Sequence, residues 1–286
     1  MEREEARLLG ALFKSGGYYK YDFGRARILV LNTNLYYSYN DAYANFSDKL
    51  DPAGQFAYME QQLEQAQKCA ASGDAKCINK RTPKTTWFRP EYNKRFLEIT
   101  ARYASTIGWM IFGHHHTDTF HIVRDSAGNP VQLLLLAPSV TPWFSNLPGA
   151  GSNNPAFRLF DVDADQQYRE ITTYAINLDS LNSGKAPHFA PLYSFTLEYG
   201  LTEITPKSIA DLVTRMESDD ALFLRYVGYN SVMKDVKMPV EPYRSAQICS
   251  MKYASYPEYN SCLKSGTAGH AFFAVLIALA CGFILF

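Results

Sequence analysis

The sequence has no excess of charge of either sign. Its 286 residues include 28 Lys and Arg against 28 Asp and Glu, and no basic block occurs. A neutral chain offers little electrostatic attraction to a polyanion, so we expect no nucleic-acid partner. Internal repeats and low-complexity tracts are also missing. With 47% apolar and 14% aromatic residues, the composition excludes a disordered chain and predicts a substantial folded core.

Cysteine is scarce, and its spacing limits what it can do. None of the five cysteines forms a C-x-x-C pair, which argues against a thiolate zinc site. Cys249 and Cys262 lie in a polar, Tyr-rich stretch and are candidates for a local disulfide in an oxidising compartment. Cys69 and Cys77 either pair across a short loop or remain free thiols. The sequon N-F-S makes Asn45 a candidate glycosylation site, which fits a secreted protein.

The two ends of the chain point to different targeting. Residues 1–7 are charged, and no apolar core of signal-peptide length follows them. Residues 271–286 carry no charge and follow a run of small residues, the pattern of a glycolipid-anchor signal that is removed. A tail-anchored helix and a buried C-terminal helix are the alternatives. An export signal at one end without a leader at the other predicts that the natural product extends further upstream.

Hydrophobic periodicity predicts an α/β region followed by a helical region. Strands are expected at residues 27–32, 107–112, 120–124, 131–137, 157–162 and 168–176, with a hairpin joining the third and fourth. Helices are expected from Asp51-Pro52, over 92–105, from Thr205-Pro206, and after a cap at Ser218. Residues 70–95 are otherwise polar and irregular. We therefore divide the chain into an α/β part (1–180), a helical part (181–264) and an apolar tail (265–286).

One cluster of histidines carries most of the chemical information. Residues 113–118 read G-H-H-H-T-D and follow the predicted strand 107–112. Open α/β sheets place ligands at the carboxyl ends of their strands. Because His114 and His116 are separated by one residue, they can reach adjacent metal ions from one loop, and Gly113 permits the tight turn. The alternative is a solvated loop without a ligand.

The motif around this cluster resembles that of a known family. I-F-G-H-H-H-T-D at 111–118 resembles the Gly-His-x-His motif of calcineurin-like metallophosphoesterases, in particular the acid sphingomyelinase-like phosphodiesterases, where Asp also follows two residues on. Further segments match the same branch in the same order: G-G-Y-Y (16–19), I-L-V-L-N-T-N-L-Y-Y (28–37), D-P-A-G-Q-F (51–56), A-P-S-V-T-P (137–142), N-N-P-A-F-R (153–158), A-Q-I-C (246–249) and S-C-L (261–263). The resemblance spans residues 14–264.

The resemblance implies a fold, a cofactor and a chemistry. It implies part of a metallophosphoesterase sandwich followed by a small helical C-terminal domain. It also implies two zinc ions, one bound by His114 and the other by His116, that together promote hydrolysis of a lipid or nucleotide phosphodiester. Asp118 is then a candidate to orient a metal-bound imidazole, or else a turn residue. Cys249 and Cys262 match the family's C-terminal disulfide. Such proteins follow the secretory pathway to the extracellular space, the cell surface or the lysosome.

The chain also departs from the family pattern. The family's site needs upstream Asp and His ligands and a further His on a later strand, but no His precedes His114 here. Where that strand should end in His-x-Pro, residues 76–83 read K-C-I-N-K-R-T-P, so we also expect a strand of the sheet to be lost. We therefore assign no catalytic residue and expect the chain as written not to hydrolyse phosphodiesters. The alternative function is a non-catalytic binding protein, secreted or anchored at the surface. Asn32, Asn34 and Asn154 are candidates to line its groove.

Overall fold

The computed structural model describes residues 10–23, 26–71, 78–81, 88–145, 151–163 and 167–265. Cys77 and the apolar run 271–286 lie outside these ranges, as does the side chain of Cys69, so the predictions about them remain predictions. Within the described ranges, no helix is long and apolar enough to cross a bilayer.

The described chain is a mixed α/β structure with small sheets and a helical C-terminal region. Its strands are β1 (Tyr19–Phe23), β2 (Ala26–Val30), β3 (Ile78–Arg81), β4 (Ile107–Trp109), β5 (Ile111–Phe112), β6 (Thr119–Arg124), β7 (Pro130–Leu136), β8 (Trp143–Ser145), β9 (Gly151–Asn153), β10 (Ala156–Val162), β11 (Tyr168–Ala175) and β12 (Ala190–Ser194). Its helices are η1 (Thr33–Tyr36), η2 (Asp41–Asn45), η3 (Pro52–Gly54), α2 (Gln55–Ala71), α3 (Pro90–Arg102), α4 (Leu178–Asn182), α5 (Phe195–Tyr199), α6 (Pro206–Ser218), α7 (Asp220–Asn230) and α8 (Tyr243–Lys252).

Two sheets meet at a single interrupted strand. One sheet has the order β1-β2-β3-β4 and the other the order β5-β7-β6. β4 and β5 are consecutive and separated only by Met110, whose carbonyl accepts a hydrogen bond of 3.0 Å from the amide of Leu135 in β7. The predicted strand 107–112 is therefore present as β4 and β5, and the predicted hairpin 120–137 is present as antiparallel β6 and β7.

The strand expected to be lost is present in another form. β3 pairs in parallel with β2 on one side and β4 on the other. The expectation of an irregular segment and a lost strand was wrong at residues 78–81. The physical reason is that two neighbouring strands would otherwise leave backbone donors and acceptors unpaired, and any backbone can satisfy them, whatever its side chains. Strand propensity is the weaker influence at such a central position.

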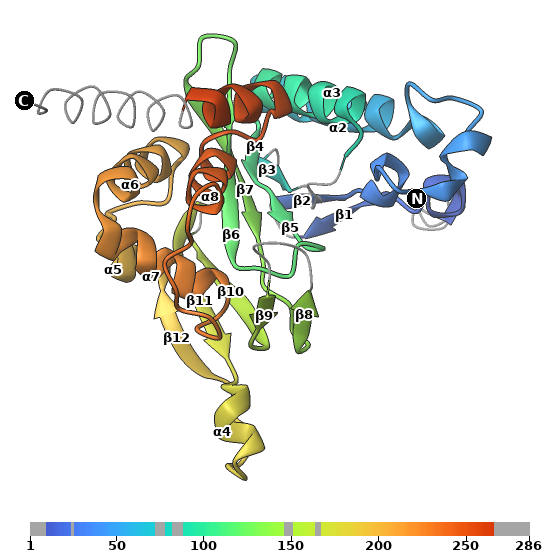
Figure 1. Ribbon diagram of the computed structural model, residues 1–286. Coiled ribbons are helices and arrows are strands. Elements are labelled where there is room, and N and C mark those ends of the chain that lie inside the picture. The colour runs from blue at the N-terminus through green and yellow to red at the C-terminus, as the bar shows by residue number, and fades with distance from the viewer. Residues whose placement is uncertain are drawn as a thin grey trace, which may run out of the picture.

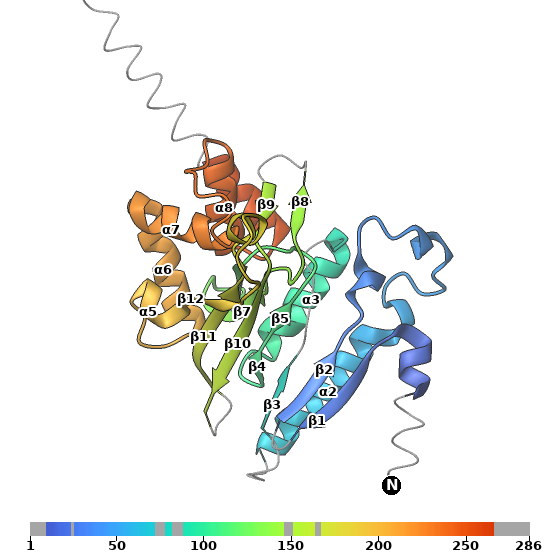
Figure 2. The same cartoon turned by 90° about the horizontal axis from the view of Figure 1, so that it is seen from below.

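β7 separates two hydrophobic cores by simple alternation. Leu134 and Leu136 pack into a core with α2 and α3, whereas Leu133 and Leu135 pack into a second core with the C-terminal helices. Side chains of a strand point alternately to its two faces, so a run of apolar residues is what a strand covered on both sides requires. Figure 1 shows β4 to β7 between α3 on one side and α5 to α8 on the other, and Figure 2 shows the same order from below.

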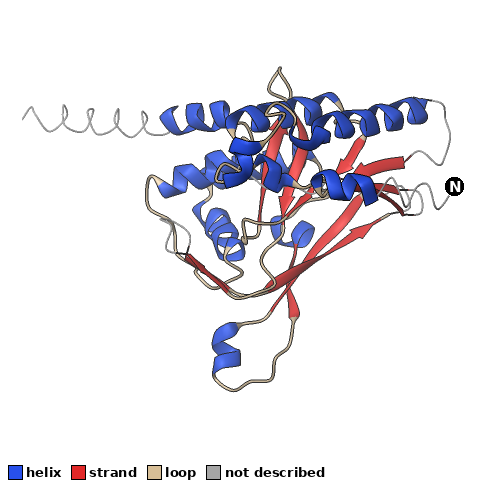
Figure 3. Ribbon diagram, turned by 90° about the vertical axis from the view of Figure 1, so that its right-hand side faces the viewer, coloured by secondary structure: helices blue, strands red, loops and turns tan. Residues whose placement is uncertain are grey.

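The C-terminal half also contains an antiparallel sheet, formed by β10, β11 and β12. β11 pairs with β10 and β12, so residues 190–194 of the predicted helical part belong to a sheet. α6 begins with the predicted Thr205-Pro206 cap, and the cap of α7 is Asp219 rather than Ser218, because the Asp219 side chain accepts from the amide of Leu222. α4 projects away from the rest of the molecule (Figure 1, Figure 3).

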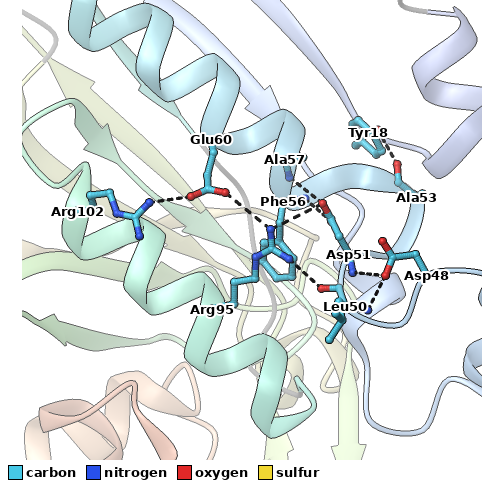
Figure 4. A network of polar contacts seen from close by, with 10 residues as sticks. All are labelled: Tyr18, Asp48, Leu50, Asp51, Ala53, Phe56, Ala57, Glu60, Arg95 and Arg102. Atoms are coloured by element: carbon cyan, nitrogen blue, oxygen red, sulfur yellow. Dashed lines mark hydrogen bonds and ion pairs between the residues drawn. The ribbon is translucent and has the colours of Figure 1, made fainter.

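Charged side chains join α2 to α3. The Asp51 carboxylate accepts hydrogen bonds from the amides of Phe56 (2.7 Å) and Ala57 (2.9 Å), and so caps the start of α2. Arg95 of α3 reaches both Asp51 (3.9 Å) and Glu60 of α2 (3.7 Å) (Figure 4). The predicted Asp51-Pro52 helix start is thus confirmed, with Pro52 in a short 3-10 turn that leads into the helix.

Candidate metal centre

The histidine loop, residues 113–118, joins the end of β5 to the start of β6. β5 pairs in parallel with β7, and the loop leaves the carboxyl end of β5. This is the position that the sequence pattern predicts for a ligand-binding loop. His114 is exposed, whereas His115 and His116 are half-buried and Asp118 is buried.

The backbone of the loop is held in an uncommon conformation. His114 has φ 74° and His116 has φ 64°, the left-handed region that residues with a side chain seldom adopt. Each such residue costs about 1–3 kcal/mol, and this conformation persists only where the surrounding structure holds it. The carbonyl of His116 accepts hydrogen bonds from the amide of Ser139 (3.1 Å) and from Nδ2 of Asn153 (2.9 Å). These two hydrogen bonds therefore stabilise one backbone conformation at His116.

Aromatic rings flank the two histidines. The Tyr37 ring meets that of His114 edge-on at 5.5 Å between centroids, and the Trp143 ring meets that of His116 at 4.9 Å. Nδ1 of His116 is buried, and none of the described residues gives it a hydrogen-bond partner. A buried polar atom of this kind usually has a ligand, an ion or water as its partner.

Electrostatics favour neutral imidazoles in this loop. Burial lowers the pKa of His114 below its ordinary value, and the neighbouring His116 lowers it further. Burial likewise lowers the pKa of His115, with His114 and His116 adding to the effect. His115 also shares a hydrogen bond of 2.6 Å between its Nδ1 and Oγ1 of Thr117. Neutral imidazole is the form that ligates metal ions.

Asp118 occupies a buried polar network instead of a turn. One oxygen of its carboxylate pairs with the guanidinium of Arg158 and accepts from the Tyr193 hydroxyl at 2.9 Å. The other accepts from Thr173 Oγ1 at 3.1 Å. Both oxygens are thus engaged by partners other than an imidazole, which favours a structural role. The role of orienting a metal-bound histidine remains only a prediction.

The loop supplies side chains of the kind that zinc binds, but fewer of them than a zinc ion needs. Two imidazoles, one with a buried ring nitrogen to which no described residue hydrogen-bonds, suit Zn²⁺, which takes about four ligands. Among the described residues, no group of three or more His, Cys, Asp or Glu side chains is placed to hold a metal. The described residues alone do not complete such a site, so we derive no reaction step through a metal.

The other predicted site residues are two cysteines, a glycosylation candidate and three asparagines. Cys249 and Cys262 form a disulfide, as predicted, with their Cα atoms 5.8 Å apart. Asn45 is exposed at the end of η2, and its glycosylation stays a prediction. The asparagines are mostly structural. Asn32 donates to the Gly16 carbonyl at 2.9 Å and Asn154 to that of Val232 at 2.9 Å, whereas Asn34 is exposed.

Several residues around the loop were missed by the sequence analysis. Arg158, Tyr193, Asn153 and Trp143 support the loop from four different strands. Asn153 and Arg158 do lie within the N-N-P-A-F-R segment that drew attention as a motif, which was their only signal. No local pattern links Trp143 or Tyr193 to the histidines.

Comparison with known proteins shows that this sequence is similar to those of a phosphodiesterase family. Residues 129–269 match the family model of the acid sphingomyelin phosphodiesterase C-terminal region. The chain is 35% identical over 273 residues to the acid sphingomyelinase-like phosphodiesterase 3b of Homo sapiens, covering 90% of this chain and 59% of that protein. It is 30% identical to the cyclic GMP-AMP phosphodiesterase SMPDL3A of Rattus norvegicus, over 88% of this chain and 58% of the relative. A sphingomyelin phosphodiesterase of Bos taurus is 27% identical over 73% of this chain and 33% of its own length. The chain thus spans less than two thirds of each of these relatives.

Proposed function

The chain belongs to the acid sphingomyelinase-like phosphodiesterase family, and on that premise we propose that His114 and His116 are its contribution to a zinc site for phosphodiester hydrolysis. The observation that carries the proposal is the loop after β5, where both histidines have positive φ and where Ser139 and Asn153 bind the carbonyl of His116. Strained residues whose surroundings over-determine their conformation are concentrated at functional sites. When bound, two zinc ions would polarise the phosphoryl group and generate hydroxide.

The chain's own residues would contribute metal ligands to such a site and restrict how those ligands are oriented. The half-buried His116 and the exposed His114 offer ring nitrogens in two different environments. Tyr37 and Trp143 restrict the two rings through edge-on contacts. Lowered pKa values keep His114 and His115 neutral near pH 7, so no proton must leave His114 before it binds a metal.

We further propose that this chain alone does not hydrolyse phosphodiesters. No His precedes His114, so the upstream histidine ligands of the family pattern have no counterpart in this sequence. Two imidazoles leave each of two zinc ions with far fewer than its about four ligands. The substrate class of the family, a lipid or nucleotide phosphodiester, follows from relatives named for sphingomyelin and for cyclic GMP-AMP.

A secretory location accompanies the proposal. The Cys249–Cys262 disulfide supports an oxidising compartment, because cytosolic thiols are kept reduced. Asn45 is exposed and therefore accessible to a glycosyltransferase. We propose the extracellular space, the cell surface or the lysosome, with the glycolipid-anchor signal at 271–286 as the route to the surface.

A second candidate function is a non-catalytic binding protein at the cell surface. The observation in its favour is that protein contacts hold the histidine loop: Ser139 and Asn153 bind the His116 carbonyl, and Trp143 packs on its ring. A site that is organised by its own protein contacts keeps its shape without the metal.

Zinc titration combined with a hydrolysis assay tests both proposals. We expect calorimetry of the full chain to show weak Zn²⁺ binding that is lost in His114→Ala/His116→Ala and kept in the control His188→Ala. With a chromogenic phosphodiester, the chain should give no turnover above the blank, while the human 3b relative serves as positive control. Zinc binding that survives in the double variant would reject the ligand assignment. Zinc-dependent turnover by the wild-type chain would reject its inactivity.

A further inference from the structure

The loop that follows α7, taken together with Tyr243 at the start of α8 as residues 232–243, presents apolar side chains to solvent. Val240 is 73% exposed and Val236 is 45% exposed. Met233, Met238 and Tyr243 are exposed as well. Single exposed apolar residues are ordinary, but five within twelve residues of one loop are not, and such clusters mark contact surfaces.

Hydrogen bonds hold this loop in shape. Val232 has φ 54° and Met233 has φ 58°, which is a genuine outlier for a β-branched residue such as Val232. The Met233 amide donates to the Gly228 carbonyl at 2.6 Å. Ser231 Oγ donates to the Asp235 carbonyl at 2.7 Å and accepts from the Asp235 amide at 2.9 Å. These bonds fix the start of the loop, residues 231–235, and the Tyr243 amide donates to the Val240 carbonyl at 2.9 Å at its other end. Both ends of the loop are thus preformed, which lowers the entropy cost of ordering it on contact.

Adjacent asparagines tie this loop to the histidine loop. Asn153 donates to the His116 carbonyl, and Asn154 donates to the Val232 carbonyl, each at 2.9 Å. Asn230, at the end of α7, exchanges two hydrogen bonds of 3.1 Å with the backbone of Asp118. Phe144, 66% exposed, follows the Trp143 that packs on His116. Figure 1 and Figure 2 both show the β8–β9 hairpin close to the segment that links α7 and α8.

The charges of the loop indicate what kind of surface it meets. Lys234 and Lys237 are balanced by Asp235 and Glu241, and Lys234 also pairs with Asp179 of α4 at 2.5 Å. The cores of protein–protein interfaces are depleted of Lys, whereas a membrane interface accepts Lys because its apolar stem lies in the interface and its ammonium reaches the headgroups. Tyr, which Tyr243 supplies here, also concentrates at that depth. A balanced net charge favours a zwitterionic surface over an anionic one.

We propose that residues 232–243, together with Phe144, dock on a neutral phospholipid surface and bring the histidine loop to the headgroup layer. The occupant is a zwitterionic bilayer of phosphatidylcholine and sphingomyelin. This deepens the proposed function, because it selects the lipid rather than the soluble nucleotide as the phosphodiester that the site faces. Docking itself needs neither zinc nor hydrolysis, so it can hold or fail independently of the metal proposal.

Hydrogen exchange on the full chain tests the proposal locally. Residues 271–286 are apolar and expected to bind lipid themselves, so bulk partitioning is not a suitable readout. We expect neutral vesicles to slow amide exchange in 232–243 and to leave the β6–β7 turn (125–129) unchanged, with or without a chelator. Val236→Asp/Val240→Asp should lose that protection. The matched control Leu159→Asp/Leu197→Asp, which changes two exposed apolar residues outside the loop, should keep it.

The salt dependence separates this mode of docking from electrostatic adsorption. Raising salt from about 0.1 M to about 1 M shortens the Debye length from roughly 10 to 3 Å, and the protection should persist. The proposal is overturned if neutral vesicles leave 232–243 unprotected, if both double variants behave alike, or if protection appears only with anionic vesicles and disappears in salt. In any of those cases, the zinc titration described above still decides the metal proposal by itself.

Discussion

Asp118 and Arg158 show how one buried pair of residues supports the histidine loop. The two side chains are 3% and 1% exposed, and the guanidinium also donates to the Leu136 carbonyl at 3.0 Å. Removing both charges from water is costly, and the hydrogen bonds from Tyr193 and Thr173 offset part of that cost. Because Asp118 begins the return from the loop into β6, its position limits where His116 can lie.

We expect Arg158→Ala to lower the free energy of unfolding by about 3–5 kcal/mol, because it leaves the Asp118 carboxylate buried without its countercharge. Arg169→Ala is the control, since it removes an ion pair to Asp163 in which the Arg side chain is 67% exposed, and such pairs are worth about 1 kcal/mol or less. Urea unfolding followed by circular dichroism measures both. Similar losses in the two variants would contradict the importance of the buried pair.

At the scale of elements, ion pairs between charged side chains hold α2 against α3. Asp51 caps α2, and Arg95 and Arg102 of α3 both reach Glu60 (Figure 4). The Arg95 guanidinium also lies 4.9 Å from the centre of the Phe56 ring. Side chains of both helices pack in one core with Phe112 of β5. The position of the helices therefore affects the strand from which the histidine loop leaves.

Asp51→Ala should destabilise the chain by about 0.5–2 kcal/mol, because two amides at the start of α2 lose their acceptor. Glu64→Ala on the same helix is the matched control. Its pair with Lys68 is exposed and worth only about 0.3–0.5 kcal/mol. Thermal unfolding of the three proteins provides the comparison. A capping role for Asp51 is rejected if Asp51→Ala loses no more than the control.

At the scale of the whole molecule, the C-terminal segment connects the two helical layers. The Ala254 amide donates to the Ile122 carbonyl of β6 at 3.0 Å, and Asn93 of α3 donates to the Ala254 carbonyl at 3.1 Å. Tyr256 donates its hydroxyl hydrogen to the Phe88 carbonyl at 2.8 Å. The disulfide then joins the helical residues 256–265 to α8. The chain thereby closes over both faces of the central sheet.

Cys249→Ser/Cys262→Ser should lower the free energy of unfolding by about 3 kcal/mol, the value expected for releasing a loop of this size. The spacing of the two cysteines is 13 residues. A reductant should destabilise the wild-type chain by a similar amount and leave the double variant unchanged. A wild-type chain that unfolds at the same denaturant concentration with and without reductant would show that the disulfide adds nothing to stability.

Local patterns in the sequence were sufficient for much of the fold. The apolar run in residues 131–137 predicted β7, and the apolar stripe Ile209, Leu212, Val213 and Met216 predicted the buried face of α6. Helix starts at Asp51-Pro52 and Thr205-Pro206 followed from capping chemistry. The strand-then-loop position of His114 and His116 followed in the same way. Each of these depends on residues within a few positions of one another, which sequence spacing records directly.

Other features were decided only when distant parts of the chain came together. β3 forms because β2 and β4 offer unpaired backbone groups on both sides, not because its residues favour a strand. Asp118 is buried because Arg158 and Tyr193, forty and seventy-five residues away, meet it there. The backbone conformation of His116 likewise rests on contacts from other segments, such as Asn153. Such contacts arise from packing, which no local spacing encodes, so the sequence determined the elements and the candidate ligands, and the tertiary structure determined what holds them in place.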